Sequence, residues 1–258
     1  MNIIITRCFQ GGAFSNACRF LAKSALTAFA LVAAAFTANA AEVISINFTR
    51  ISGDYKYGIL NDSEIYSGIL SDQITGAAWN TITGPDGNGK SGSKYLTTFW
   101  DGNGVATLPE NTVELTWNAN DYWQDGSRTD FMRAYLDDNG RGPVVGVTGI
   151  TYPVYDLIIY CNGESGRPNF HPFNVNGVWY THDGNGTVPG SSSWGSRQSD
   201  IEEGKNALRI TGLSGKLSIQ GKARDGSLGG CISAIQIVKS DGAATKPAAP
   251  DFSFGPNP

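Results

Sequence analysis

Asp-Gly and Asn-Gly dipeptides occur twelve times along the chain, beginning at 86, 88, 101, 103, 125, 139, 162, 176, 183, 185, 225 and 241. Tight hairpin turns require positive backbone φ angles, which glycine adopts freely and asparagine and aspartate tolerate. Around these dipeptides lie short runs rich in β-branched and aromatic residues, at 43–48, 95–100, 112–117, 144–147, 155–160, 178–181, 207–210, 216–220 and 231–238. Short runs of this kind with frequent turn signals predict an all-β fold.

Apolar and polar residues alternate in several of these runs. Every second residue is apolar in TVELTW (112–117) and in ISINF (44–48). This period of two is typical of a strand that is buried on one face. The runs at 155–160 and 231–238 are apolar on both faces, which predicts central strands. No segment has a sustained helical period, and 129–136 is the best candidate for a short helix.

The spacing of the runs predicts the domain organisation. About nine strands over some 200 residues fit one antiparallel β-sandwich, jelly-roll-like in type, over residues 41–240. Residues 241–258 contain four prolines and no alternation. A Pro/Ala-rich tail or linker is therefore predicted there.

The first forty residues have the pattern of a secretory signal peptide. Residues 1–24 contain three basic and no acidic residues, an apolar run follows at 25–36, and small residues precede Ala41. This arrangement predicts cleavage between Ala40 and Ala41 and a secreted, periplasmic or cell-surface protein. A transmembrane helix needs roughly 20 apolar residues, so no transmembrane anchor is predicted.

Cleavage would change the charge and the cysteine content. The first 40 of the 258 residues hold three of the 19 basic residues and none of the 23 acidic ones, so the net charge falls from −4 to −7 in the remaining 218 residues. This acidity argues against a nucleic-acid partner, which would require a basic face. Cys161 and Cys231 remain and flank predicted central strands, so a disulfide is expected between them. Two separately buried thiols are the alternative.

Six short segments occur in one order along the chain: VISINF (43–48), AAWN (77–80), LTW (115–117), MRAYL (132–136), YDLIIY (155–160) and AIQIV (234–238). Together they resemble the exported β-sandwich domains of PEP-CTERM-type bacterial surface proteins, which look like galactose-binding-like and carbohydrate-binding jelly rolls. The resemblance implies the fold over most of residues 42–239 and no particular chemistry. The chain has no Pro-Glu-Pro sorting signal, so covalent surface sorting is not implied.

Catalytic motifs do not stand out. A Ser-His-Asp hydrolase would have to use His171 or His182, and the sequence GESG (163–166) lacks the second spaced glycine of a nucleophile elbow. The adjacent acids at 137–138 and 202–203 would point to opposite faces of an extended chain, whereas glycoside hydrolysis needs two carboxyl groups about 5–9 Å apart. No catalytic residue is assigned, and a non-enzyme is favoured.

Three Asp-Gly-Asn-Gly tetrads, at 86–89, 101–104 and 183–186, raise the question of calcium. An EF-hand loop carries a glutamate at position 12, but here that position is Thr97, Thr112 or Trp194. The tetrads are therefore predicted to be hairpin turns, and no metal site or cofactor is assigned. A structural calcium held by scattered loop oxygens remains open.

Aromatic residues in polar loops are the best candidates for ligand binding. Trp79 and Trp117 lie among apolar or alternating residues and are predicted to be in the core, whereas Trp123 and Trp194 lie among polar ones. A ring in a polar loop either packs on the rim of the sandwich or is offered to a ligand, such as the apolar face of a sugar. The predicted ligand-binding residues are Tyr122, Trp123, Asp125, Arg128, Trp194 and Arg197.

These observations favour an exported, non-catalytic β-sandwich that binds a polysaccharide or a cell-surface glycan. One alternative is a structural or adhesive surface module without a small-molecule site. The other is a secreted hydrolase acting on glycans, which would need a histidine or two acids in a cleft. Exposure of the rings of Trp123 and Trp194 would separate the first two.

Overall fold

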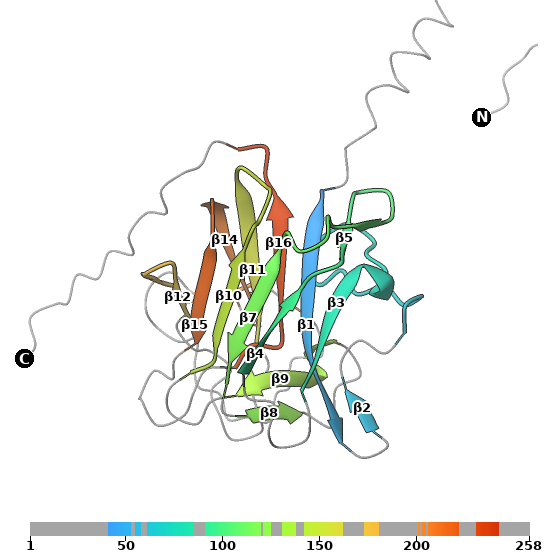
Figure 1. Cartoon of the computed structure of the whole chain (residues 1–258), viewed down its shortest axis with the longest axis vertical. Helices are drawn as coiled ribbons and strands as arrows, with labels where there is room; N and C mark the ends of the chain where they lie inside the picture. The colour runs from blue at the N-terminus through green and yellow to red at the C-terminus, as the bar shows by residue number, and fades with distance from the viewer. Residues whose placement is uncertain are drawn as a thin grey trace, which may run out of the picture. The chain divides into compact units, whose positions relative to one another are not determined.

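The computed structural model describes residues 41–52, 55–57, 61–84, 91–119, 121–124, 131–137, 142–161, 173–180, 201, 203–204, 206–221 and 231–242. The chain divides into two units, Met1–Ala40 and Ala41–Pro258, and the described residues all belong to the second. Most of them lie in two facing β-sheets, so the predicted β-sandwich is confirmed (Figure 1).

The larger sheet has eight strands, in the order β14 (Ala207–Leu213), β11 (Tyr155–Tyr160), β16 (Ala234–Lys239), β1 (Val43–Ser52), β5 (Thr98–Trp100) and β6 (Val105–Thr107), while β2 (Tyr55–Tyr57) and β3 (Trp79–Gly84) also pair with β1. The smaller sheet runs β13 (Val178–Tyr180), β12 (Phe173–Val175), β15 (Leu217–Gly221), β10 (Val144–Thr148), β7 (Glu114–Asn118) and β4 (Ser91–Tyr95). A hairpin of β8 (Asp121–Gln124) and β9 (Ala134–Asp137) forms a third, two-stranded sheet.

The pairing is antiparallel with one exception among the described strands. β1 and β3 run parallel, with Ser45 opposite Trp79 and Arg50 opposite Gly84. A parallel pair cannot be closed by a tight hairpin, so a long connection must join its strands. Here that connection spans residues 53–78.

The space between the sheets holds the main hydrophobic core. Alternate residues of β1 point into it, among them Ile44, Ile46 and Phe48, and they are fully buried. Leu115 and Val145 meet them from the smaller sheet. Trp117 is half-buried and packs against the same cluster, as its alternation predicted.

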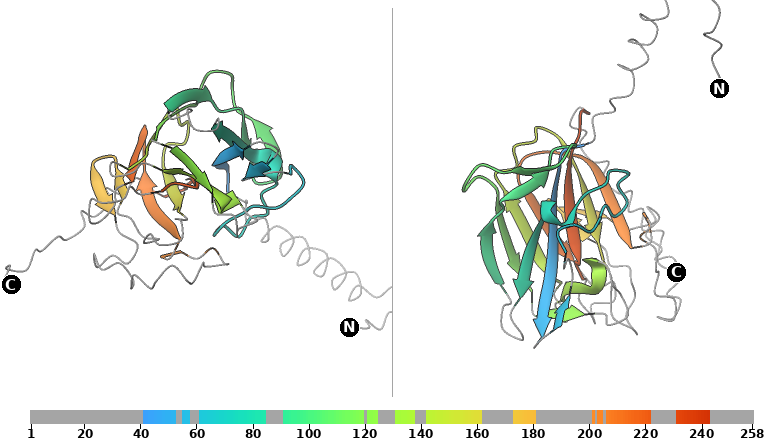
Figure 2. Two further views of the ribbon diagram at one scale, coloured as in Figure 1. Left: turned by 90° about the horizontal axis from the view of Figure 1, so that it is seen from below. Right: turned by 90° about the vertical axis from the view of Figure 1, so that its right-hand side faces the viewer.

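A second core covers the outer face of the larger sheet. It joins Val43, Ile158 and Val238 to residues from the connection before β3 and from the 3₁₀ turn η2 (Phe131–Arg133). Figure 2 (right) shows η2 as a short coil close to β1. Because both faces of β1, β11 and β16 are covered, several of their polar residues are buried as well, as Ser45 and Gln236 illustrate.

Three details differ from the sequence predictions. The run at 95–100 is not one strand, because β4 ends at Tyr95 in one sheet and β5 begins at Thr98 in the other. The helix expected at 129–136 is only η2, followed directly by β9, whose four residues are all buried. The strands β2, β3, β6, β8, β9 and β12 were not predicted, and β4 was predicted only at its last residue, Tyr95.

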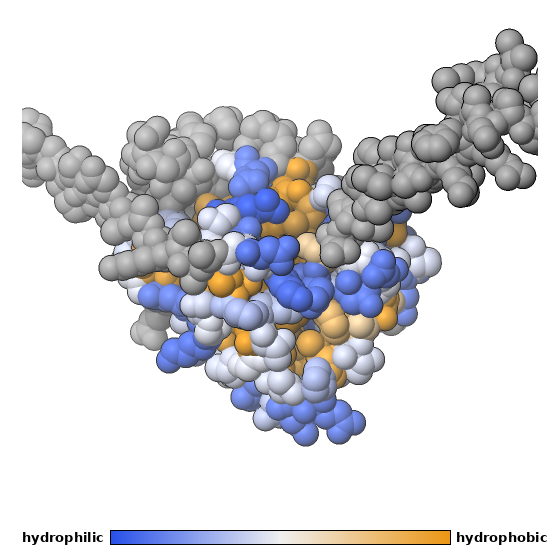
Figure 3. All heavy atoms as spheres, turned by 90° about the horizontal axis from the view of Figure 1, so that it is seen from above, coloured by the Kyte–Doolittle hydropathy of each residue, from blue (hydrophilic) through white to orange (hydrophobic). Residues whose placement is uncertain are grey.

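Large exposed apolar side chains are few in the described residues. They are Ile65, Tyr95, Val105 and Val144, and each comes from a different segment. One end of the molecule, seen in Figure 3, has hydrophilic and hydrophobic residues interspersed. No helix among the described residues is long and apolar enough to span a membrane. The predicted tail at 241–258 lies almost wholly outside the described residues.

Candidate functional site

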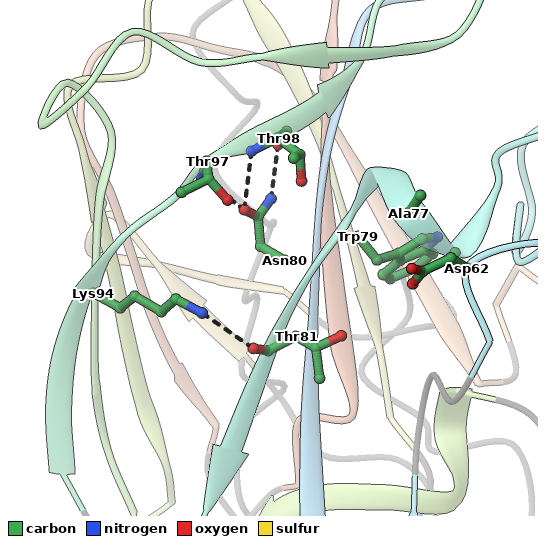
Figure 4. Close-up of a pocket in the computed structure, with 9 residues that line it drawn as sticks. Asp62, Ala77, Trp79, Asn80, Thr81, Lys94, Thr97 and Thr98 are labelled. Atoms are coloured by element: carbon green, nitrogen blue, oxygen red, sulfur yellow. Dashed lines mark hydrogen bonds between the residues drawn. The ribbon is translucent and has the colours of Figure 1, made fainter.

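A pocket of about 450 Å³ lies beside β3, at the place where the chain crosses from one sheet to the other (Figure 4). β3 pairs with β1 along one edge, and no described strand pairs with its other edge. The lining comes from three segments: Asp62, Gly76 and Ala77 before β3, Trp79, Asn80 and Thr81 on β3, and Lys94, Thr97 and Thr98 at the crossing.

Asn80 holds the crossing chain against β3. Its Nδ2 donates to the carbonyl oxygens of Ser45 (3.1 Å) and Thr98 (2.8 Å). Its Oδ1 accepts from the backbone N–H groups of Thr97 (2.9 Å) and Thr98 (3.3 Å). The side chain is only 4% exposed, and each of its polar atoms faces a partner of the opposite kind. One amide therefore fixes this wall of the pocket to two strands (Figure 4).

A glycine and a local turn bring Asp62 to the pocket. The side-chain oxygen of Asn61 accepts from the N–H (3.1 Å) and the hydroxyl (2.8 Å) of Ser63, and Ala77 N–H donates to the Asp62 carbonyl at 3.2 Å. A Cβ atom at Gly76 would lie 2.3 Å from the Asn61 carbonyl oxygen. Glycine is thus needed for this close approach of two segments, which places a carboxylate at the pocket rim.

Lys94 supplies the opposite charge from β4. Its Nζ donates to the Thr81 carbonyl oxygen at 3.4 Å, a long hydrogen bond at an exposed position. An ammonium has three donors, so two remain for other acceptors. The pocket therefore contains one cationic and one anionic side chain, both accessible from solvent.

Trp79 lies at the inner side of the pocket. It is 5% exposed, and its ring packs against Phe131 with 4.9 Å between ring centroids. Its position in the core was predicted, and its Nε1–H is buried with no hydrogen-bond partner among the described residues. A buried donor left in this state costs about 1–3 kcal/mol.

The lining has the chemistry of a binding site for a neutral, hydroxyl-rich molecule. It combines a carboxylate, an ammonium and threonine hydroxyls, and its formal charges cancel. The nine lining residues include no histidine or cysteine and one carboxylate, so they form no carboxylate pair. No cluster of three or more metal-ligating side chains is found in the part of the chain that the structure describes.

The ligand-binding residues predicted from the sequence are placed only in part. Tyr122 and Trp123 belong to β8, where they lie opposite Leu136 and Tyr135 of β9, but their side chains are outside the description. Asp125, Arg128, Trp194 and Arg197 lie outside the described residues, as do His171, His182 and the GESG segment. The ligand-binding role of these residues stays a prediction.

Cys161 and Cys231 are thiols and not a disulfide, so the predicted bridge is absent from the structure. Both are buried in the main core, where cysteine packs as a small apolar residue. Burial raises the pKa of the Cys161 thiol to about 12, because the thiolate would lose its hydration. The alternative of two buried thiols is the one that the structure shows.

The tetrad at 101–104 is a hairpin turn between β5 and β6, as predicted. Asp101 Oδ1 accepts from the backbone N–H groups of Asn103 and Gly104, both at 2.8 Å. These hydrogen bonds lower the pKa of the Asp101 carboxyl group. This carboxylate oxygen therefore serves the turn itself. The other two tetrads lie outside the described residues.

Sequence reasoning missed the pocket, because its residues carry no common motif. Asp62, Trp79 and Lys94 are far apart in the chain and meet only through the parallel pairing of β3 and the crossing after β4. One local signal was present. Asn80, a polar residue with weak strand propensity, directly follows an apolar segment, and such a residue in a strand usually has a specific hydrogen-bonding role.

Comparison with known proteins does not place the chain in a family. No family model and no curated protein sequence matches it. The resemblance to PEP-CTERM-type domains therefore stays a prediction.

Several solved structures are similar in part. CBM35 from Cellvibrio japonicus is 18% identical over 47% of this chain and 82% of its own, with a TM-score of 0.29. A Bacillus subtilis protein, YXIM, is 10% identical over 79% of this chain and 41% of its own, with a TM-score of 0.37. An exo-β-1,3-galactanase from Phanerochaete chrysosporium, solved with β-1,3-galactotriose, is 12% identical over 53% of this chain and 31% of its own, with a TM-score of 0.28. At these TM-scores none of them assigns a function to the chain.

Proposed function

We propose that this protein is an exported, non-catalytic β-sandwich that binds a glycan, with the pocket beside β3 as a sugar site. The observation that carries the proposal is the lining of this pocket, which brings the Asp62 carboxylate, the Lys94 ammonium and threonine hydroxyls together beside the buried Trp79. The volume of about 450 Å³ lies within the usual range of small-molecule pockets.

The balance of charge favours a neutral ligand. Asp62 and Lys94 contribute one negative and one positive group, so neither a phosphate nor a cation finds an excess of opposite charge. A sugar hydroxyl both donates and accepts, and it can bond to a carboxylate, an ammonium or a threonine hydroxyl. Hydrogen bonds to charged groups are about twice as strong as those between neutral groups.

The frame around the pocket supports recognition without large movement. Asn80 joins the crossing chain to β1 and β3 through four hydrogen bonds. A pre-formed site loses little conformational entropy when a ligand binds. Because the Trp79 ring is almost fully buried, stacking on a sugar ring would fall to Trp123 and Trp194.

The proposal is tested by measuring the binding of glycans to the exported protein, produced from the full chain. A panel of immobilised soluble and insoluble glycans identifies a ligand, and calorimetry with the best ligand then compares variants. We expect Asp62→Asn and Lys94→Gln each to weaken binding about tenfold or more, since each removes a hydrogen bond to a charged group. Lys216→Gln and Glu110→Gln are matched controls, because both residues are exposed and neither lines the pocket.

The variants Trp123→Ala and Trp194→Ala test the loop aromatics separately. If glycan binding weakens in these two variants but is unchanged in the Asp62 and Lys94 variants, the sugar binds at the loops, and the proposal that it binds in the pocket is wrong. If the protein retains no glycan at all, the structural or adhesive module is the better assignment. Release of reducing sugar from a bound glycan would instead support the secreted hydrolase.

A further inference from the structure

The carboxylate of Asp72 accepts a hydrogen bond from the backbone nitrogen of Ala41, the atom that would become the N-terminus when the predicted signal peptide is removed. The backbone N–H of Ala41 donates to Asp72 Oδ2 at 3.1 Å. Asp72 is half-buried, and within the described part of the chain this amide is the only partner of its carboxylate. A partly buried carboxylate is thus bonded to a neutral group, with no counter-charge among the described residues.

The charged side chains next to Ala41 do not supply a counter-charge for Asp72. The Glu42 side chain pairs with Lys239, and the Lys239 N–H donates to the Glu42 carbonyl oxygen at 2.8 Å. These two charges neutralise each other beside Ala41. The loop that carries Asp72 is also fixed in place, since Ile74 N–H donates to Ser67 Oγ at 3.1 Å.

We propose that processing between Ala40 and Ala41 completes this contact, and that Asp72 is the binding site for the α-ammonium group of the mature chain. A signal peptidase would hydrolyse the peptide bond, with water as co-reactant. The C–N bond breaks, the water oxygen adds to the Ala40 carbonyl carbon, and the Ala41 nitrogen takes up protons to become an ammonium. The positive charge forms on the atom that already contacts Asp72.

The ion pair would tie the start of β1 to the connection that covers the outer face of the larger sheet. Val43, the first residue of β1, is fully buried, and Ala41 packs against the same cluster. A charged pair at this point stabilises the residues just before a central strand, because chain ends otherwise tend to fray. The ammonium group has three donors where the amide has one.

The first test is the terminus of the exported protein. The full 258-residue chain is produced in bacteria with a general secretion pathway, and the exported product is sequenced from its N-terminus. We expect Ala41 as the first residue. Any other first residue, including Met1, overturns the proposal, because the charge would then lie away from Asp72.

The second test separates the ion pair from the hydrogen bond already present. Asp72→Asn is introduced into the natural chain and into a chain with Gly-Ser-Gly-Ser inserted between Ala40 and Ala41, in which residue 41 keeps a neutral amide after processing. In urea unfolding of the exported proteins, we expect Asp72→Asn to raise the unfolding constant about fivefold in the natural chain and less than twofold in the insertion chain. Equal effects in the two chains would show that no ion pair forms. Because these measurements do not involve glycans, their failure leaves the proposed function unaffected.

Discussion

Replacing Asn80 by alanine is the sharpest test of how the pocket is built. The change removes a side chain that makes four hydrogen bonds, two as donor and two as acceptor. It leaves the N–H groups of Thr97 and Thr98 and the carbonyl oxygens of Ser45 and Thr98 without this partner. No local substitute is in place, since these groups come from three different strands or crossing segments.

The expected loss follows from these contacts. A net contribution of about 0.5–1.5 kcal/mol for each hydrogen bond gives about 2–6 kcal/mol for four. The lower half of this range is the better value, because Thr97 is exposed and water can reach its N–H, and because two donors share one oxygen. We therefore expect a loss of about 3 kcal/mol, or a fall of roughly 6–12 °C in Tm for a domain of this size.

Thermal and urea unfolding of the exported protein measure this loss. Asn61→Ala is the matched control, since within the described part of the chain the Asn61 side chain bonds only to Ser63 at an exposed turn, and it should cost less than about 1 kcal/mol. Asn80→Asp should be at least as harmful as Asn80→Ala, because a carboxylate would face two carbonyl oxygens. If Asn80→Ala unfolds within about 1 kcal/mol of the parent, the amide does not hold the crossing chain, and the pocket wall must be fixed in another way.

Two further predictions concern a glycine and the buried thiols. Gly149→Ala should destabilise the protein by about 3 kcal/mol or more in urea unfolding, because φ is +73° and the new Cβ would lie 1.8 Å from the Thr112 carbonyl oxygen. The control Gly177→Ala has a φ of +89° but no atom within 4 Å of the new Cβ, so it should cost only about 1–2 kcal/mol. Equal losses in the two variants would contradict this reasoning. Iodoacetamide at pH 8 should not label Cys161 in the native protein, because the thiol, with its pKa raised to about 12, stays protonated until the pH rises toward that value. After unfolding without reductant, Cys161 and Cys231 should both be labelled. If the unfolded protein were labelled only after reduction, the two cysteines would form the disulfide that the sequence predicted.

Much of the sandwich could be predicted because its signals are local. Alternation in 44–48 and 113–117 reflects strands that bury one face against the main core, and the structure confirms both. The turn at Asn176 and Gly177 joins β12 to β13 with φ angles of 51° and 89°, the conformation that an Asn-Gly pair indicates. In these segments, the residues that determine the structure are neighbours in the chain.

The pocket could not be predicted in the same way, because its geometry depends on how distant strands pair. The run at 95–100 reads as one strand by composition, yet it is divided between two sheets around the buried Leu96. That division moves Thr97 and Thr98 next to Asn80, and Lys94 to the opposite sheet. A period of two in the sequence shows which face of a strand is buried but not which sheet the strand joins.

Trp79 and Asn80 show why the pattern of an apolar segment does not reveal a pocket beside it. The apolar neighbours of Trp79 correctly predicted a core residue, and its ring packs on Phe131. Asn80 follows directly on β3 and is buried as well, but its side chain bonds to the crossing chain that forms the pocket wall. Because successive side chains of a strand point to opposite faces, the pattern that predicts one face as core says nothing about the role of the polar residue on the other.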